Sequence, residues 1–275
     1  MKVGDVCSFL DAHFPLALQE KYDNAGGQVL FPDDELRGVL VSLDCDGAVI
    51  DEARALGCNL IVTHHPVFFR PLRNLSVGDP RSEMVFGLVE GRTSLYSAHT
   101  NLDKIYYDRL GQTIGLTEMS LLVKTEAPAA GGGREYGFGV RGDFNPPLSL
   151  EELLHRVCER LSLHFLVYAG NASRPVRRCA VSGGSGGGSI ERVLRDREVD
   201  CVITGDVGYH DVKAAVDHGV AVIDAGHYGT ERILLDFLLS DIQDYLTKSS
   251  MAGQIKACVS RMETNPFSVF LPDLK

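Results

Sequence analysis

Residues 60–66 constrain the fold most strongly, because an apolar run ends there at two adjacent histidines. The run Leu60-Ile61-Val62 has the length and composition of a buried strand in a parallel sheet. Pro66 ends strand pairing directly after His64 and His65. Ligands of open α/β sheets bind beyond the carboxyl ends of the strands. The sequence therefore predicts a functional site at the end of this strand.

The neighbouring segments predict a strand–helix–strand unit around this strand. Residues 39–43 have the pattern of a strand, and residues 48–56 have helical spacing that ends at Gly57, a residue suited to a helix C-cap. A further strand is expected over 94–98, and it leads into His99 and Asp103. Alternating strands and helices of this kind are typical of the α/β class with a parallel sheet.

The second half of the chain repeats this order faintly. The segments 179–182, 190–197, 200–206 and 220–227 parallel 40–42, 48–56, 59–65 and 95–99. We therefore predict two related α/β lobes, with the site in the cleft between them. The first lobe is expected over residues 1–125, completed by 226–275, and the second over 126–225, with the boundary in the small-residue run 128–133.

Composition narrows the classes of function. The net charge of −10 opposes binding to duplex nucleic acid. The seven cysteines include no CxxC pair, and no apolar run has the length of a membrane span or the form of a signal peptide. We expect a cytoplasmic protein in a reducing compartment, with no membrane partner.

Five residues that follow three predicted strands are candidate metal ligands: His64, His65, Asp103, His227 and Glu231. Imidazole and carboxylate donors without thiolate suit Zn, Fe, Mn, Co or Ni. Five donors are too many for one tetrahedral catalytic zinc with an open position. They suit two ions about 3.5–4 Å apart, a centre that activates water. Each residue alone has a simpler interpretation: a structural histidine, a helix N-cap at Asp103, or a first-turn carboxylate at Glu231.

Several neighbouring residues are further candidates, and most of them have more than one interpretation. His99 is a candidate general base, a partner that orients Asp103, or a structural histidine. Asp206 and His210 are candidates for lining the site. The glycine run 183–188 favours a flexible connection over a phosphate-binding loop, because it lacks the Lys-Ser/Thr of a P-loop. The arginines at 174, 177 and 178 favour a solvated surface over a phosphate contact.

The segments Thr-His-His-Pro, Ser-Ala-His-Thr-Asn-Leu-Asp and Gly-His-Tyr-Gly-Thr-Glu resemble the signature of the Nif-three-like family. These are YbgI-type dinuclear metal-centre proteins, often named GTP cyclohydrolase I type 2 homologues. The stretches 1–15, 22–28 and 204–211 are also similar to family motifs. The resemblance implies metal ligands at His64, His65, Asp103, His227 and Glu231. It also implies a Nif-three-like fold and a homohexameric ring with sites facing an interior cavity.

The chain departs from the family pattern at a few positions. Tyr22 stands where the family commonly has Trp, and Gly27 stands where it usually has a larger apolar residue. The chain also has no room for the inserted domain of longer members. These departures affect the expected range of substrates, and none of them touches the five ligands.

The function expected from these features is metal-dependent hydrolysis, with His99 as the catalytic residue that carries a proton. The cofactors would be two divalent transition-metal ions, and the substrate would be a small molecule such as a nucleotide. The family name suggests a GTP cyclohydrolase-like reaction, but a fold does not establish chemistry. The alternative is a non-enzymatic metal-binding, metal-delivery or regulatory interaction protein.

Overall fold

The computed structural model describes residues 1–125, 135–196, 199–251 and 253–270. The chain divides into two compact units. The first consists of Met1–Ile105 and Leu235–Thr264, and the second of Tyr106–Leu234 and Asn265–Lys275. The boundary run 128–133 lies outside the described residues.

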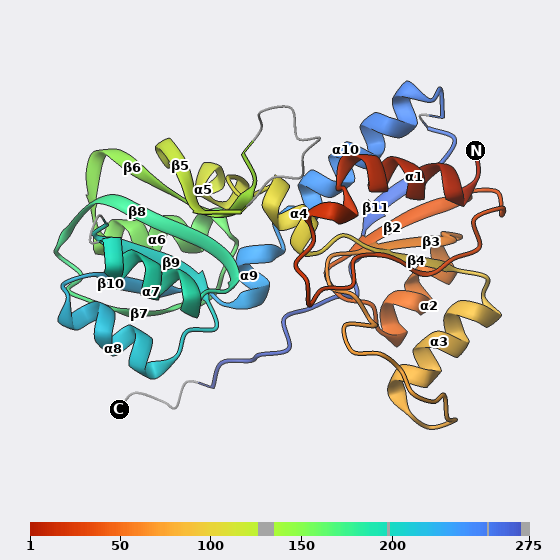
Figure 1. Ribbon diagram of the computed structural model, residues 1–275, viewed down its shortest axis with the longest axis horizontal. Coiled ribbons are helices and arrows are strands. Elements are labelled where there is room, and N and C mark those ends of the chain that lie inside the picture. Colours follow the sequence, from red (N-terminus) through yellow and green to blue (C-terminus); the bar gives the residue numbers. More distant parts are fainter. Residues whose placement is uncertain (126–134, 197–198, 252, 271–275) are drawn as a thin grey trace. The chain divides into compact units, whose positions relative to one another are not determined.

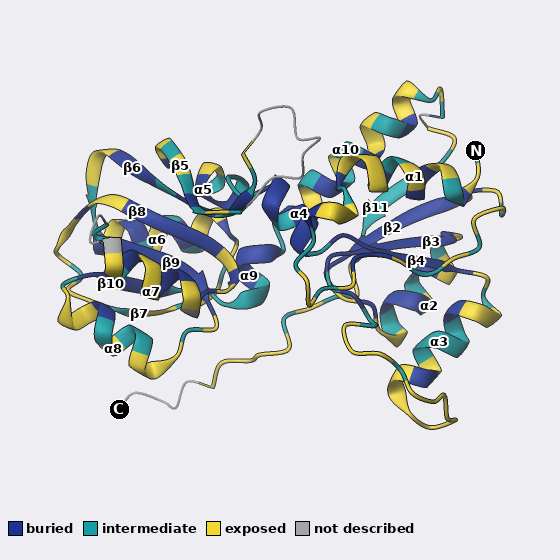
Figure 2. Cartoon of the chain, viewed as in Figure 1, coloured by how far each residue is buried: buried dark blue, intermediate teal, exposed yellow. Residues whose placement is uncertain are grey.

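The first unit is built on a five-stranded sheet in the order β1-β4-β3-β2-β11. The four strands from β4 to β11 are parallel, and β1 is antiparallel to β4. The strands are β1 (Gly26–Val29), β2 (Gly38–Ser42), β3 (Leu60–Thr63), β4 (Ser94–Ser97) and β11 (Lys256–Val259). Every residue of β2, β3 and β4 is buried, as Figure 2 shows, so these strands form the centre of the unit.

Helices cover both faces of this sheet (Figure 1). On one face, α2 (Gly47–Leu56) and α3 (Pro80–Glu90) pack on Leu40, Ile61 and Leu95. On the other face lie α1 (Val3–His13) and α10 (Leu234–Lys248). The hydroxyl of Tyr96 donates a hydrogen bond to Asp11 of α1 at 2.7 Å. This sandwich fixes the strand ends from which the candidate ligands project.

The second unit has a six-stranded sheet in the order β5-β6-β8-β9-β10-β7. β8, β9 and β10 are parallel, and the other strands are antiparallel to their neighbours. The strands are β5 (Thr117–Lys124), β6 (Gly137–Ser149), β7 (Val167–Ala169), β8 (Pro175–Ser185), β9 (Cys201–Gly205) and β10 (Ala221–Asp224).

The second sheet is also covered by helices on both faces. α5 (Arg109–Ile114) and α6 (Leu150–Arg160) pack against Cys179, Val181 and Ile203. α7 (Gly187–Asp196) and α8 (Tyr209–Asp217) pack against Ala180, Val202 and Val222. Alternate residues of a strand point to opposite faces, so neighbouring residues of β8 and β9 belong to different cores.

The predicted α/β class is confirmed. In each unit, three consecutive parallel strands are joined by helices, β2-β3-β4 in the first and β8-β9-β10 in the second. The division into units differs from the predicted boundaries, because β5 pairs with β6 and places Thr117–Lys124 in the second unit. The short helix α9 (His227–Glu231) also belongs to the second unit rather than to the first.

One local expectation is corrected. The glycine run 183–188 is not a flexible connection, because Gly183 to Ser185 continue β8 and Gly187 starts α7. Among the described residues no helix is long and apolar enough to cross a bilayer.

The pairing of β6 with β8 includes an ion pair whose loss we expect to destabilise the second unit. Asp143 and Arg178 are partners in the register, with Nε to Oδ1 at 2.6 Å and Nη2 to Oδ2 at 3.0 Å. The Arg178 hydrogen bonds lower the pKa of Asp143. Asp143→Asn is expected to cost about 1–3 kcal/mol of unfolding free energy at pH 7.

The pH dependence of this loss follows from the depressed pKa. The folded chain holds Asp143 ionised more readily than the unfolded chain, so the contribution is present above the ordinary aspartate pKa of about 3.9 and declines as the pH falls through the folded value. Urea unfolding of wild type and Asp143→Asn at several pH values measures it. A difference between the two proteins that stays constant down to acid pH would contradict the assignment.

Candidate metal centre

The end of β3 places two histidines at the carboxyl edge of the first sheet. The backbone N–H groups of His64 and His65 donate to the carbonyl oxygens of Ser42 at 3.1 Å and Leu43 at 2.8 Å, which extends the pairing with β2 beyond Thr63. The Thr63 hydroxyl donates to the His65 carbonyl oxygen at 2.9 Å. These bonds hold the turn, so the two imidazoles start from a fixed backbone.

His99, just after β4, joins them in a group of three rings. Ring nitrogens of His64, His65 and His99 lie within 4.8 Å of one another. The ring centroids are 4.9 Å apart for His64 and His65, 5.1 Å for His64 and His99, and 5.6 Å for His65 and His99. Three imidazole nitrogens at this spacing could hold a metal ion.

Each of the three rings has a hydrogen-bond acceptor at Nδ1. The acceptors are Ala98 O at 2.9 Å from His64, Asp44 Oδ1 at 2.9 Å from His65, and Asp23 Oδ1 at 2.6 Å from His99. An acceptor beside Nδ1 keeps the proton of a neutral imidazole on that atom and leaves the lone pair on Nε2. Histidines that ligate metals are oriented in this way. The side chains therefore fit a metal ion bound through Nε2.

Asp23 connects the N-terminal loop to the histidine group. Its Oδ2 accepts hydrogen bonds from the Thr100 backbone N–H at 3.1 Å and from the Thr100 hydroxyl. Burial raises the pKa of Asp23, but the hydrogen bonds from His99 and Thr100 outweigh burial, and the pKa falls to about 2. Asp23 is therefore an anion at neutral pH, and it holds the His99 ring at Nδ1.

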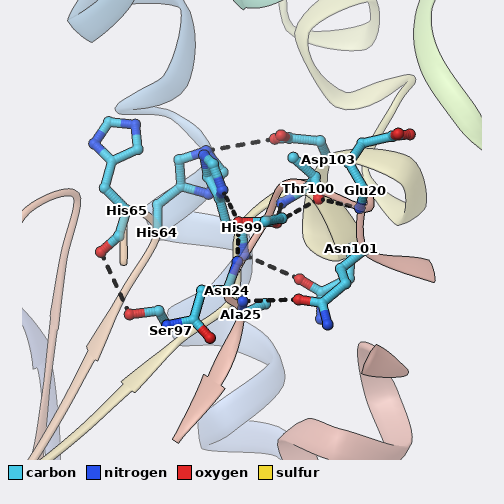
Figure 3. A network of polar contacts seen from close by, with 12 residues as sticks. Glu20, Asn24, Ala25, His64, His65, Ser97, His99, Thr100, Asn101 and Asp103 are labelled. Carbon is cyan, nitrogen blue, oxygen red and sulfur yellow. Dashed lines mark hydrogen bonds and ion pairs between the residues drawn. The ribbon is translucent and has the colours of Figure 1, made fainter. Parts of the chain in front are cut away.

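Asp103 lies on α4 (Thr100–Ile105), directly after His99 (Figure 3). Its Oδ1 is 3.5 Å from Nε2 of His64. The helix is anchored on its other side, where Lys104 Nζ donates to Leu18 O at 2.7 Å and pairs with Glu20 at 2.6 Å. This anchoring fixes the carboxylate of Asp103 beside the imidazoles.

The second unit carries a pair of donors on α9. His227 Nε2 and Glu231 Oε2 are 3.0 Å apart, one helical turn from each other. His227 Nδ1 is 2.7 Å from Asp206 Oδ2, so this ring also has an acceptor at Nδ1. Both ring nitrogens of His227 therefore face carboxylates, and a metal cation suits such a set of donors.

Gly184 of β8 provides the space for the Glu231 carboxylate. A Cβ at Gly184 would lie 2.2 Å from Glu231 Oε1 and 3.5 Å from His227 Nε2. The backbone of Gly184 has φ +62°, a conformation that favours glycine. Its N–H donates to the Thr230 hydroxyl at 2.9 Å, which ties β8 to α9. The absence of a side chain at Gly184 thus leaves room for the carboxylate of a candidate ligand.

Each of the two units contributes some of the sequence-predicted residues. His64, His65, His99 and Asp103 lie together in the first unit, and His227 and Glu231 lie together in the second. His99 is among the rings that could hold a metal, in addition to its predicted catalytic role. Among the residues of secondary interest, Asp206 contacts His227, whereas Arg178 pairs with Asp143.

Sequence reasoning missed Asp23, Asp44 and Gly184 as parts of these groups. Asp44 could have been predicted, because residues that follow two paired parallel strands lie side by side. Ser42 of β2 and Thr63 of β3 are register partners, and Asp44 and His65 each come two residues later. Asp23 is distant in sequence from His99, and nothing in the local pattern of the N-terminal loop indicates the contact.

Removal of the Asp44 carboxylate is expected to weaken metal binding without unfolding the chain. The side chain of Asp44 is 62% exposed, so folding depends little on it, yet it orients His65. Loss of such an outer partner costs about 10–100-fold in metal affinity. Equilibrium dialysis with Zn²⁺ compares Asp44→Ala with wild type and with Asp51→Ala, an exposed aspartate of α2. Equal affinities of all three proteins would show that Asp44 does not orient the ring.

Comparison with known proteins shows which family the chain belongs to. The family model described as Duf34/NIF3 (NGG1p interacting factor 3) matches residues 1–266. The chain belongs to the Duf34/NIF3 family. A relative from Clostridium acetobutylicum, named GTP cyclohydrolase 1 type 2 homolog, is 34% identical over 84% of this chain and 85% of its own length.

Solved structures of the Duf34/NIF3 family have the same fold. A Bacillus cereus protein described as related to NIF3 matches with a TM-score of 0.89 at 21% identity, over 98% of this chain and 99% of that chain. A Staphylococcus aureus protein matches with a TM-score of 0.87 at 25% identity, again over 98% and 99% of the two chains. The resemblance predicted from the three histidine-containing motifs is thus confirmed.

Proposed function

We propose that this Duf34/NIF3 protein binds two divalent transition-metal ions and hydrolyses a small molecule. The ligands would be His64, His65, Asp103, His227 and Glu231. The observation that carries the proposal is the common orientation of the imidazoles, each with a hydrogen-bond acceptor at Nδ1, so that Nε2 is the atom left to bind a metal. Donors of nitrogen and oxygen type favour Zn, Fe, Mn, Co or Ni over Ca.

The chemistry expected of bound ions is Lewis-acid activation of water and of the substrate bond that breaks. The chain's own residues supply orientation and charge. Asp44 and Asp206 hold the rings of His65 and His227 at Nδ1. The carboxylates of Asp103 and Glu231 would offset two of the four positive charges that two divalent ions bring.

His99 is the residue proposed to carry a proton. Its Nδ1 is held by Asp23 at 2.6 Å, so its Nε2 is the atom that accepts a proton from water or returns one to a leaving group. Asp23 remains ionised and stabilises the imidazolium that forms. This is the role that a buried carboxylate has beside a catalytic histidine in other hydrolases.

The name GTP cyclohydrolase 1 type 2 homolog, borne by curated relatives, makes nucleotides the first substrates to test. Metal-reconstituted protein would be incubated with GTP, other nucleotides and phosphoesters, and products would be separated by chromatography. We expect turnover by the wild type and a loss of at least about 100-fold in kcat for His99→Ala, within the range that general acid–base catalysis contributes. His155→Ala, an exposed histidine of α6, serves as the control.

Two outcomes would contradict the enzymatic proposal. Wild-type protein with bound metal that turns over none of these substrates would favour the alternative of a metal-binding or metal-delivery protein. Equal rates for His99→Ala and the wild type would remove His99 from the mechanism. Metal content measured in parallel distinguishes a lost proton carrier from a lost ion.

A further inference from the structure

We propose that Tyr22 and Phe69 form a platform on which a planar ring of the substrate stacks. The two side chains are called the aromatic platform below. The proposal rests on the proposed function, since it names the substrate class of the same site: a small molecule with a neutral heteroaromatic ring, such as a nucleobase. All of its residues lie in the first unit.

The aromatic platform continues directly from the histidine group. The rings of Phe69 and His99 meet edge to face, with centroids 6.0 Å apart and an interplanar angle of 90°. The rings of Tyr22 and Phe69 meet at 6.2 Å and 67°. Tyr22 is 65% exposed and Phe69 is 45% exposed. Large apolar surface beside a candidate catalytic centre indicates a ligand-binding surface.

Hydrogen bonds hold the two loops of the platform together. Asn24 Nδ2 donates to the Phe68 carbonyl oxygen at 3.0 Å, and the Phe68 N–H donates to Gln28 Oε1 at 3.2 Å. Gln28 Nε2 also donates to the Asn24 carbonyl oxygen at 2.8 Å. The loop after β3 is therefore tied to the loop before β1. A platform that is ordered before binding loses less entropy when a ligand stacks on it.

The chemistry of the two side chains selects the kind of ring. Burial, followed by the charges of Glu20, Asp23 and Asp103, raises the pKa of Tyr22, so the phenol is neutral at neutral pH. Two uncharged aromatic side chains suit a neutral planar ring. Aromatic side chains stack on every nucleobase through its π-face, so the platform recognises ring shape rather than sequence or sugar. A ligand stacked here would direct its remaining groups toward His99 and the other histidines.

Isothermal titration with two probes tests the aromatic platform. Guanosine monophosphate and ribose 5-phosphate share the sugar phosphate, and only the first carries a ring. Tyr22→Ala and Phe69→Ala are expected to weaken binding of guanosine monophosphate to the metal-loaded protein about 5- to 100-fold, with little change for ribose 5-phosphate. Tyr22→Trp is expected to retain binding. Phe165→Ala is the matched control, because Phe165 is 42% exposed and lies in the second unit.

Several results would overturn the platform. One is that the wild type does not bind guanosine monophosphate. Another is that the alanine variants lose affinity for both probes equally. A third is that light scattering shows a changed oligomeric state in those variants. The last result would make the surface a subunit interface. The same experiments distinguish failure of the platform from failure of the proposed function. If binding depends on the ring and the metal content is normal, but no substrate is hydrolysed, then the platform proposal stands and the proposed enzymatic activity is wrong.

Discussion

Replacing Glu231 with alanine is expected to lower the affinity for a transition-metal ion by more than about 100-fold, beyond the loss typical of an outer partner. Glu231 is 6% exposed, and its Oε2 lies 3.0 Å from His227 Nε2. A buried carboxylate is costly to desolvate unless a positive charge lies beside it. Its removal should therefore abolish an ion site while costing the metal-free protein little stability.

Equilibrium dialysis with Zn²⁺ and with Mn²⁺ measures this loss, and circular dichroism checks that the variant is folded. Glu191→Ala is the matched control, because Glu191 lies on the exposed surface of α7 with a side chain that is 77% exposed. Wild-type affinity in Glu231→Ala would show that this carboxylate is a structural residue. Equal losses in Glu191→Ala would point to a general effect of net charge instead.

Gly184→Ala is expected to weaken metal binding although it changes no ligand. The new Cβ would lie 2.2 Å from Glu231 Oε1, so the carboxylate must move. The left-handed backbone at φ +62° adds a strain of about 1–2 kcal/mol for any residue with a Cβ. We therefore expect a loss of affinity comparable to that of Glu231→Ala, together with a lower unfolding temperature.

The neighbouring glycine provides a close control for this variant. A Cβ at Gly183 would lie 3.6 Å from Glu231 Cγ, which is an ordinary van der Waals contact, and its backbone is not left-handed. Gly183→Ala should therefore bind metal as the wild type does. If both alanine variants bind metal normally, then β8 does not determine where the Glu231 carboxylate lies. Metal dialysis and thermal unfolding of the pair decide between these results.

The elements predicted best from the sequence are those whose local signals agree. The helix over 48–56 has an Asp46 side chain that accepts from the Val49 N–H and ends at Gly57 with φ +73°. In this segment the hydrophobic spacing, the N-cap and the C-terminal glycine all indicate the same helix, so the local pattern agrees with the tertiary structure.

The elements that sequence reasoning missed depend on partners far along the chain. β11 is a short strand whose only described sheet partner, β2, lies more than two hundred residues earlier. β5 is mostly exposed or half-buried, so its alternation gives a weak signal, and it is defined by its pairing with β6. The tendency of a residue to form a strand depends more on packing and pairing than on its intrinsic preference. Strands at the edge of a sheet, such as β5 and β11, are therefore hard to predict from one sequence.

The candidate ligands could be predicted because they follow strands, whereas their supporting residues could not. His64, His65 and Asp103 follow β3 and β4, whose strands were evident from short apolar runs. Asp23 holds His99 from a loop 76 positions away, and Gly184 shapes the site through the absence of a side chain. Contacts of this kind arise from the three-dimensional arrangement and leave no local pattern.

Elemental analysis of the wild-type protein, purified without a metal-chelating column, tests the central claim most directly. The account predicts about two transition-metal ions per chain, as in other two-metal hydrolytic centres, and a lower content in His65→Ala and Glu231→Ala. A wild-type protein without transition metal, even after incubation with Zn²⁺, Mn²⁺ or Fe²⁺, would contradict it. So would variants whose metal content equals that of the wild type, because the imidazoles and carboxylates at these strand ends would then serve the fold alone.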